Sequence, residues 1–336
     1  MHEPQGHLAL DLVRVTEVAA LAAAQFMGTG DKNAGDGAAV DAMRAALKNL
    51  AMDGVVIIGE GEKDNAPMLH AGEKLGNGSP PQVDIAVDPV EGTNLLALGR
   101  GNAISVIALT IRGGMWNPGP SLYMKKLVVD KRARDVIDIT QSPAENLRRI
   151  AKALNRPVEK LTVFVLDKPR HANLIHRIRQ VGARVSLQTD GDVAGALQAA
   201  IPGTGVDVLM GIGGTPEAVI TAAAVKALGG GLQAQCAPQS EHERARVEEI
   251  FGVAWNAILT ECDLITADDA FFAATGITDG PLMEGVHFDR DMGVTTHSMV
   301  IRAKTGTIRH IKAVHQFSKL AGLDTIDYLP DENFVG

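Results

Sequence analysis

Residues 84–93, Asp-Ile-Ala-Val-Asp-Pro-Val-Glu-Gly-Thr, join an apolar run to a turn that carries two acids. The apolar residues predict a buried strand over residues 83–87. Because Pro89 lacks a backbone N–H, we expect it to end the pairing of this strand and to fix the turn. Asp88 then lies at the strand end and Glu91 follows one turn later, so both carboxylates can face one point. The stretch predicts an α/β protein whose strand delivers acids to a ligand site.

A hydroxyl stands next to these carboxylates. Thr93 follows Gly92, whose missing side chain permits a close approach to the backbone. Mg²⁺ and Mn²⁺ prefer oxygen ligands, usually one or two carboxylates with substrate phosphate and water. Two carboxylates beside a hydroxyl suit metal-assisted attack of water on phosphorus. A turn followed by a helix cap uses the same residue types, and this stretch alone favours neither interpretation.

The composition excludes several classes of protein. The chain has 336 residues, 46% of them hydrophobic and 21% charged, which indicates roughly two domains with large cores. A formal net charge of -8 argues against a non-specific nucleic-acid binder. The 2 cysteines stand apart without CxxC spacing and no HExxH pattern occurs, so a disulfide scaffold and a zinc site are both unsupported.

No segment of the sequence has the pattern of a membrane or export signal. The longest apolar runs stay well short of the roughly 18 residues that a membrane span needs. The first ten residues, MHEPQGHLAL, lack the basic and apolar regions of a signal peptide. We therefore expect a cytoplasmic protein with no membrane and no nucleic-acid partner.

Further acids follow other strands or lie in glycine-rich loops. Residues 55–58 predict a buried strand, and Glu60 and Asp64 come directly after it in a glycine-rich turn. Asp36 lies in the glycine-rich loop 28–37, just before a predicted helix. Taken singly, the first two acids fit a solvated loop and Asp36 fits a helix N-cap. Together with Asp88 and Glu91, they favour a metal site.

The order of predicted elements changes along the chain. Residues 142–145, Ser-Pro-Ala-Glu, form a capping box that opens a helix to about residue 154. After a turn at residues 155–157, strands and helices alternate, which is typical of βαβ units and a parallel sheet. We therefore expect two α/β halves with a shared cleft: a metal-binding domain over residues 1–157 and a domain with substrate-binding loops over residues 158–336. The strands are expected at 83–87, 103–111, 126–129, 161–166, 183–188 and 206–212, and the first two helices at 12–27 and 38–50.

The second half contributes one more acid and two cations. Glu217 follows a strand, with Thr215 at the expected N-cap position, so its carboxylate could simply favour the helix dipole. The two glycines before it make room for a ligand against the backbone. Lys168 and Arg170 leave another strand of the same predicted sheet, and ligands bind outside the carboxyl ends of such strands. We expect these two cations to form a phosphate clamp opposite the acids.

These segments together resemble the lithium-sensitive sugar and inositol phosphatase superfamily, and within it the bacterial class II fructose-1,6-bisphosphatases. The resemblance rests on eight segments in order: GDKNAGDGAAVDAM, VIIGEGEKDNAPML, VDIAVDPVEGTN, Tyr123-Met124, LDKPRH, TDGDVAGAL, GIGGTPEAV and ATGITDG. It implies two layered α/β halves, an α-β-α-β-α sandwich of the sugar phosphatase fold, with the active site between them. It also implies a homo-oligomer, a dimer or tetramer.

The resemblance also implies an activity and the residues that perform it. The activity is hydrolysis of the 1-phosphate of fructose 1,6-bisphosphate by metal-activated water, a step of gluconeogenesis, with Mg²⁺ or Mn²⁺ as cofactor. Asp36 and Glu60 would bind one metal ion, and Asp88, Glu91 and Glu217 a second. Thr93 would orient the attacking water, helped by an acid such as Asp64, with Asp36 also near the reaction. The substrate pocket would consist of Glu91, Gly92, Thr93, Tyr123, Lys168, Pro169, Arg170, Asp190, Gly191, Asp192 and Gly214, with Lys32 as a further phosphate contact.

Four other functions would use parts of the same sequence pattern. A bifunctional fructose-1,6-/sedoheptulose-1,7-bisphosphatase would need the same residues, whereas an inositol-phosphate phosphatase would not need the clamp of Lys168 and Arg170. A catalytically silent sugar-phosphate sensor would lack the hydroxyl or one of the metal acids, and here all are present. A nucleotide-dependent dehydrogenase lacks support because neither GxGxxG nor a P-loop occurs.

Overall fold

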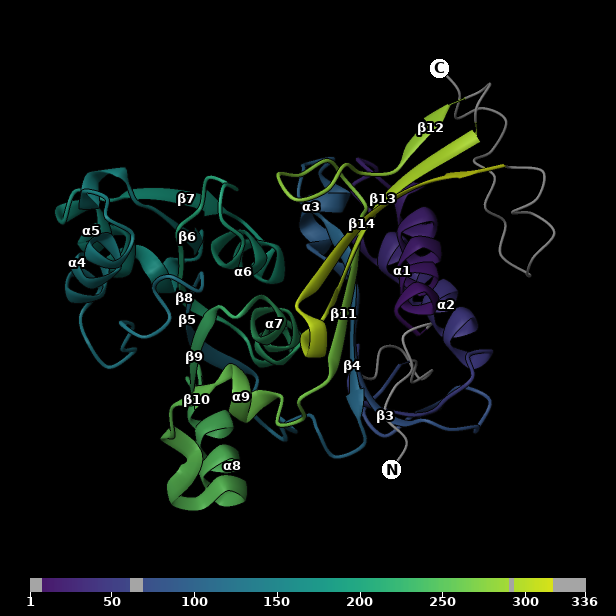
Figure 1. The fold of residues 1–336 in the computed structure, drawn as a ribbon, viewed down its shortest axis with the longest axis horizontal. Helices are drawn as coiled ribbons and strands as arrows, with labels where there is room; N and C mark the ends of the chain where they lie inside the picture. The colour runs from purple at the N-terminus through teal and green to yellow at the C-terminus, as the bar shows by residue number, and fades with distance from the viewer. Residues whose placement is uncertain (1–7, 61–68, 290–292, 317–336) are drawn as a thin grey trace.

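The computed structural model describes residues 8–60, 69–289 and 293–316, and it has five alternating layers of helix and sheet (Figure 1). One pair of helices covers the outer face of a first sheet, a second pair lies between the two sheets, and a third pair covers the outer face of the second sheet. The α-β-α-β-α sandwich implied by the resemblance is therefore confirmed. In the order of the layers, these helices are α1 (Leu8–Ala24), α2 (Lys32–Lys48), α6 (Asp192–Ala200), α7 (Thr215–Leu228), α4 (Pro143–Ala153) and α5 (Ala172–Gln180).

The first sheet is mostly antiparallel. Its order is β12-β13-β11-β4-β3-β1-β2, with β14 also paired to β13, and only β1 and β3 run parallel. Its strands are β1 (Asp53–Ile58), β2 (Lys74–Leu75), β3 (Gln82–Glu91), β4 (Ile104–Ile111), β11 (Ala270–Gly276), β12 (His287–Asp289), β13 (Gly293–Arg302) and β14 (Thr307–His315).

The second sheet has the order β10-β9-β5-β8-β6-β7. The parallel pairing predicted from the alternation of strands and helices is confirmed for β6 with its neighbours β7 and β8. The prediction is wrong for the rest of this sheet, because β5 pairs antiparallel with both β8 and β9. The strands are β5 (Tyr123–Val129), β6 (Thr162–Leu166), β7 (Arg184–Gln188), β8 (Val208–Gly214), β9 (Gly231–Cys236) and β10 (Leu259–Thr260).

The two sheets do not divide the chain at residue 157. Strand β5 precedes that residue but belongs to the second sheet, and β11 to β14 follow it but belong to the first sheet. The chain therefore crosses between the sheets more than once. The division at residue 157 stays a prediction, and the two sheets are the units used below.

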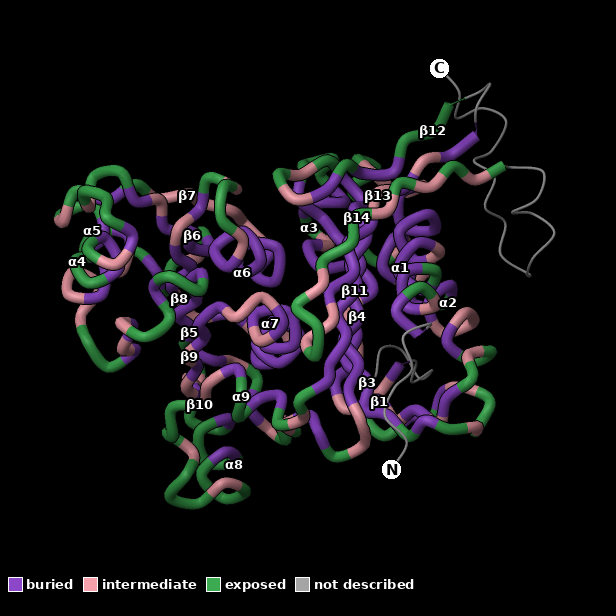
Figure 2. Tube along the Cα trace, viewed as in Figure 1, coloured by how far each residue is buried: buried purple, intermediate pink, exposed green. Residues whose placement is uncertain are grey.

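Three apolar cores hold the layers together (Figure 2). The largest surrounds α6 and α7, because these helices contact a sheet on each side. Helix α7 is accordingly apolar nearly all round, with Ala218 and Val225 fully buried, as expected of a helix without a solvent-facing side. Helix α4 lies on the outside and is strongly amphipathic, with Leu147 and Ile150 buried. The packed helices α6 and α7 thus join the two sheets.

Local signals explain where several helices begin. The predicted cap of α4 is confirmed, because the Ser142 hydroxyl accepts a hydrogen bond of 3.1 Å from the N–H of Glu145. The loop predicted over residues 28–37 is wrong in its second half. Asp31 caps α2 by accepting hydrogen bonds from Asn33 (3.1 Å) and Ala34 (3.0 Å), so the helix begins at Lys32. The remaining helices are α3 (Thr93–Ala97), α8 (Glu241–Phe251), α9 (Glu261–Leu264) and the 3₁₀ turns Val158–Lys160, Pro169–His171, Gly252–Asn256 and Ala303–Thr305.

Pro89 does not end strand β3, contrary to the prediction. The strand continues to Glu91, and its pairing with β4 shifts register between Asp88 and Glu91. The missing N–H of Pro89 falls within this irregularity, where no regular ladder bond is needed. The acids of this stretch therefore stand on a strand rather than on a free turn.

Candidate active site

Glu91, the last residue of β3, connects the first sheet to the central helices. Its Oε1 accepts a hydrogen bond of 3.0 Å from the backbone N–H of Val193, in the first turn of α6. Gly92 follows with φ 96°, a left-handed conformation that an L side chain rarely adopts. Thr93 then begins the short helix α3. The sequence Glu-Gly-Thr thus turns the chain from strand β3 into helix α3.

The five predicted metal acids lie close enough to repel one another. The pKa of Asp88 is raised well above its usual range, first by burial and then by the charges of Glu60, Glu91, Glu217 and Asp36. Asp36 is in α2, Glu60 follows β1, Asp88 and Glu91 are on β3 and Glu217 is in α7, so only the tertiary fold gathers them. This repulsion is unfavourable unless protons or cations reduce the negative charge.

Burial raises the pKa of Glu91 well above its usual range, and the charges of Asp190, Asp192 and Glu217 act in the same direction. The pKa of Glu217 is also raised, mainly by burial, while the nearby charge of Lys126 opposes the shift. One buried oxygen on each, Oε2, has no hydrogen-bond partner among the described residues. Buried carboxylate oxygens without donors are what a hard cation binds. The residues therefore fit a site for divalent metal, although no three described side chains already stand in the arrangement of a complete ligand set.

Lys126 is a functional residue that the sequence did not single out. It lies on β5, is buried, and forms an ion pair with Asp192 at the first position of α6. Asp192 was predicted as a substrate contact, but its carboxylate is already engaged by this lysine. A lysine among the buried residues of a strand is unusual, and that was the signal in the sequence.

Two glycines at the end of β8 leave space for carboxylates. A side chain on Gly214 would collide with the carboxylate of Glu217, and one on Gly213 would collide with that of Asp192. The room that the sequence predicted for a ligand is thus occupied in part by the acids themselves. Helix α7 begins at Thr215 with Gly214 as N-cap, one residue earlier than predicted, and Glu217 stands in its first turn.

A cavity of about 490 Å³ opens beside these groups, a volume typical of small-molecule sites. Both acids and cations line it, and they come from both sheets, from the central helices and from the loops beside them. Eight of the predicted site residues line this cavity: Glu91, Tyr123, Lys168, Arg170, Asp190, Asp192, Gly214 and Glu217.

Arg170 is held in place before any ligand binds. Its Nε and Nη2 donate hydrogen bonds of 3.1 and 2.8 Å to the carbonyl oxygen of Ile212 on β8. The centre of the guanidinium lies 5.3 Å from the centroid of the Tyr123 ring, a cation–π contact. Tyr123 therefore orients the arginine, in addition to lining the pocket.

His171, which the sequence did not identify, fixes the loop that carries Arg170. Its Nδ1 lies 2.7 Å from the carbonyl oxygen of Leu166, and its Nε2 accepts a hydrogen bond of 2.8 Å from the N–H of Ile212. The buried imidazole thereby connects the end of β6 to β8. The pKa of His171 is lowered, chiefly by burial.

Other predicted residues lie at the margins of the cavity. Asp190 accepts a hydrogen bond of 3.0 Å from the side chain of Asn94, next to Thr93. Pro169 starts the turn between Lys168 and Arg170, and Gly191 is the left-handed N-cap of α6.

Two further predictions have different outcomes. Lys32 is exposed at the start of α2 and does not line the cavity, so a phosphate contact stays a prediction. Asp64 lies outside the described residues.

The chain is similar to known sugar bisphosphatases over most of its length. Residues 6–315 match the family model described as bacterial fructose-1,6-bisphosphatase, glpX-encoded. The chain is 43% identical over 325 residues to fructose-1,6-bisphosphatase 1 class 2 of Escherichia coli (strain K12). The aligned region covers 93% of this chain and 96% of that protein. The class 2 fructose-1,6-bisphosphatases of Escherichia coli O6:H1 and Shigella flexneri match to the same extent.

Proposed function

Because this chain belongs to the bacterial, glpX-encoded fructose-1,6-bisphosphatase family, a metal-dependent family of phosphatases, we propose that the acidic cavity between its sheets is the site of catalysis. The enzyme hydrolyses fructose 1,6-bisphosphate to fructose 6-phosphate and inorganic phosphate. We assign the cleaved group as the 1-phosphate, held at the acidic end of the cavity. The similarity to fructose-1,6-bisphosphatases does not require sedoheptulose bisphosphate or inositol phosphate as an alternative substrate.

One observation supports the assignment of the site more than any other. Asp88 stands within a group of four other acids that raise its pKa, and these acids come from α2, from the segment after β1, from β3 and from α7. Such a concentration of carboxylates costs stability, so a fold retains it where a cation is to be bound. Lys168 and Arg170 line the same cavity, which suits a substrate with phosphates at both ends.

The cofactor that suits these ligands is Mg²⁺ or Mn²⁺, since every candidate ligand is a carboxylate. Asp36 and Glu60 would hold one ion, and Asp88, Glu91 and Glu217 a second. When bound, the ions supply positive charge that stabilises the phosphoryl oxygens during the reaction.

The protein's own residues position the substrate and the water. Thr93 is half-buried beside Glu91, and its hydroxyl forms no hydrogen bond with another described residue. The hydroxyl is therefore available to orient the attacking water and to pass on its proton. At the other end of the cavity, Arg170 can grip the second phosphate through two parallel hydrogen bonds, and Lys168 adds a point charge.

Other properties implied by the resemblance complete this proposal. Membership of the lithium-sensitive superfamily, and with it sensitivity to lithium, stays a prediction. A homo-oligomeric state and a cytoplasmic location stay predictions. No helix in the described part of the chain is long and apolar enough to cross a bilayer.

The test is phosphate release from a panel of sugar phosphates with Mg²⁺, with Mn²⁺ and with excess chelator. The expected result is rapid release from fructose 1,6-bisphosphate with either metal and none with chelator. Full turnover by rigorously metal-free enzyme would disprove the role of the acids as metal ligands. Release at equal rates from mono- and bisphosphates would disprove the two-ended pocket.

A further inference from the structure

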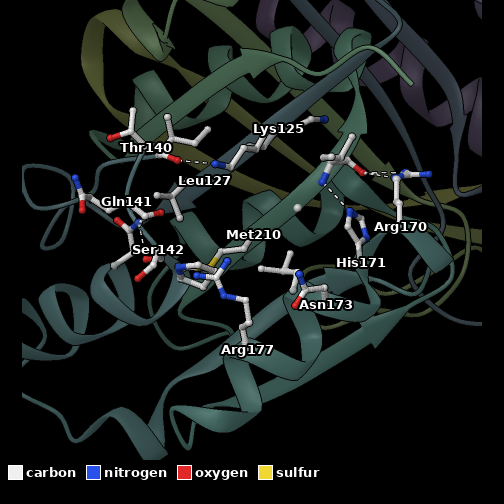
Figure 3. A pocket seen from close by; sticks show the side chains of 17 residues that line it. Lys125, Leu127, Thr140, Gln141, Ser142, Arg170, His171, Asn173, Arg177 and Met210 are labelled. Atoms are coloured by element: carbon white, nitrogen blue, oxygen red, sulfur yellow. Dashed lines mark hydrogen bonds between the residues drawn. The ribbon is translucent and has the colours of Figure 1, made fainter. Parts of the chain in front are cut away.

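A second cavity, of about 520 Å³, lies on the second sheet beside the candidate active site (Figure 3). Its walls come from β5, the loop that leads into α4, the start of α4, helix α5 and strand β8. In Figure 3 the loop residues Thr140, Gln141 and Ser142 lie on one side of it, and Arg170 and Asn173 on the other. The volume is within the range of sites for small metabolites.

The charged side chains that line this second cavity are all cationic. None of its 17 lining residues is acidic, whereas Lys125 and Arg177 both face it. This differs from the chain as a whole, whose net charge is -8. Among the described residues, no carboxylate forms an ion pair with either of these two cations.

Lys125 and Arg177 repel each other across this cavity. The pKa of Lys125 is lowered, first by burial and second by the charge of Arg177. Its Nζ donates a hydrogen bond of 2.6 Å to the carbonyl oxygen of Ile139, which neutralises no charge. Asp138 opposes the shift, but its Oδ1 already accepts hydrogen bonds from the N–H (2.9 Å) and hydroxyl (2.6 Å) of Thr140. An anion between the two cations would relieve the repulsion.

The rest of the lining suits an organic phosphate better than a bare ion. Leu127, Leu174 and Met210 give one part of the wall an apolar surface. The side chains of Gln141 and Asn173 can donate to and accept from hydroxyl groups at the rim. Arginine grips a phosphate through two hydrogen bonds, and lysine adds a mobile point charge.

We propose that this cavity is a second binding site, separate from the site of catalysis, for a small phosphorylated metabolite whose phosphate contacts Lys125 and Arg177. The cavity has no carboxylate that could hold a metal, so it binds without cleaving. It shares one wall residue with the catalytic cavity, Arg170, whose guanidinium is tied to the carbonyl of Ile212. Occupation of the second site therefore acts on the substrate clamp through this arginine.

The test measures binding of inorganic phosphate and of ribose 5-phosphate to the full-length, metal-free protein by calorimetry, in excess chelator. Chelator removes the contribution of metal to phosphate affinity in the catalytic cavity. We expect Arg177→Ala and Lys125→Ala each to weaken binding about tenfold or more, the usual loss for a hydrogen bond to a charged group. Both side chains are exposed, so both variants should fold.

The matched control is Arg179→Ala, an exposed arginine on the same helix that does not line the cavity. It should bind both probes as the wild type does. Lys168→Ala, in the catalytic cavity, should keep the binding event that is lost in Arg177→Ala. Absence of binding to the wild type, or equal affinity of wild type and Arg177→Ala, would overturn the proposal. A loss in Lys168→Ala as large as in Arg177→Ala would show that the two cavities are one site, and would overturn it too.

Discussion

Lys126 and Asp192 form a buried ion pair close to the carboxylates of Glu91 and Glu217 in the candidate active site. The side chain of Lys126 is 2% exposed and that of Asp192 is 10% exposed, so neither charge is solvated. The charge of Lys126 also reaches Glu217, whose pKa it holds down against the effect of burial. The lysine thus acts as a fixed internal cation at the second-sheet side of an acidic cluster. Its removal would leave Asp192 buried without a counter-charge.

Replacement of the lysine should therefore destabilise the fold. We expect Lys126→Met to lower the free energy of unfolding by about 3–5 kcal/mol, the usual cost of breaking a buried pair on one side. The double variant Lys126→Met/Asp192→Leu should recover much of this loss, because no charge is then left unpaired. Urea denaturation of wild type and both variants measures the effect. A loss below about 1 kcal/mol in the single variant would show that water or a shifted side chain solvates Asp192.

Glu217 should show its role in the response to metal rather than in stability. We expect Glu217→Gln to shift the Mg²⁺ or Mn²⁺ requirement upward, since a neutral amide is a poorer ligand than a carboxylate. The control is Glu145→Gln, because Glu145 also stands in a first helical turn but lies on the exposed outer helix α4. That variant should keep the metal titration of the wild type. Identical metal titrations for Glu217→Gln and wild type would leave Glu217 with only a helix-dipole role.

The sequence located the acids correctly in kind but not always in conformation. Asp88 could be predicted at the end of a strand because the apolar run before it is short and clear, whereas Glu91 was predicted in a turn and stands on the strand. Asp36 was placed in a loop because glycines surround it. Asp31 offers the helix a better cap, so Gly35 and Asp36 become part of α2. The low helix propensity of the glycines was outweighed by the N-cap that Asp31 provides, and counting glycines does not reveal that cap.

The pair of Lys126 and Asp192 could not be predicted in the same way. The two residues are brought together because β5 lies in the second sheet, next to β8, whereas the sequence order suggests that it belongs to the first. Strand membership of this kind is decided by long-range pairing and not by the local pattern. The roles of Tyr123 and His171 in orienting Arg170 depend on the same arrangement.

His171 should titrate below the usual range of histidine. Its pKa is lowered from 6.5, mainly by burial and also by the charge of Arg170, while the charge of Asp192 and the bond to the carbonyl of Leu166 oppose the shift. In the folded protein Nδ1 donates to Leu166 and Nε2 accepts from Ile212, so a proton on Nε2 would break the second bond. We expect an NMR titration of this imidazole to give a midpoint below 6.5.

The same shift gives stability a pH dependence of known sign. Since the folded pKa of His171 is below the unfolded value, the unfolded state binds more protons between the two values. The contribution of His171 is therefore complete above about pH 6.5 and is lost as the pH falls through the folded pKa. His297 and His315 also have lowered pKa values, so the slope must be compared between wild type and His171→Gln. Equal slopes would contradict the prediction.

Thr93 tests the proposed proton step. The helix-cap interpretation of Thr93 is not what the structure shows, since Gly92 holds the N-cap position of α3 and no side-chain cap bond forms. We expect Thr93→Ala to keep the fold and to lower kcat by roughly 10²- to 10⁴-fold, the range for a proton-transfer partner. Thr93→Ser keeps the hydroxyl and should retain most of the rate. A kcat close to wild type in Thr93→Ala would exclude the hydroxyl from the reaction.

Arg170 decides how a bisphosphate is selected over a monophosphate. Metal ions and Thr93 need only the phosphate that is cleaved, so selectivity must come from groups that hold the other one. Arg170 is neither paired with Asp167 nor a helix cap; it is oriented by the carbonyl of Ile212 and the ring of Tyr123. An oriented guanidinium loses little freedom on binding, which favours affinity. We expect Arg170→Ala to lower kcat/KM for fructose 1,6-bisphosphate by about 10- to 150-fold.

The decisive quantity in this experiment is the ratio of kcat/KM for the bisphosphate to kcat/KM for the monophosphate. A monophosphate has no second phosphate to lose, so its slow hydrolysis should barely change in Arg170→Ala, and the preference for bisphosphate should collapse. Arg170→Lys keeps the charge but not the two parallel hydrogen bonds, and should fall between wild type and the alanine variant. Arg179→Ala is the control for loss of an exposed arginine. Equal losses on both substrates would mean that Arg170 supports the loop through Ile212 and does not hold the distal phosphate, because damage to the loop would affect every substrate alike.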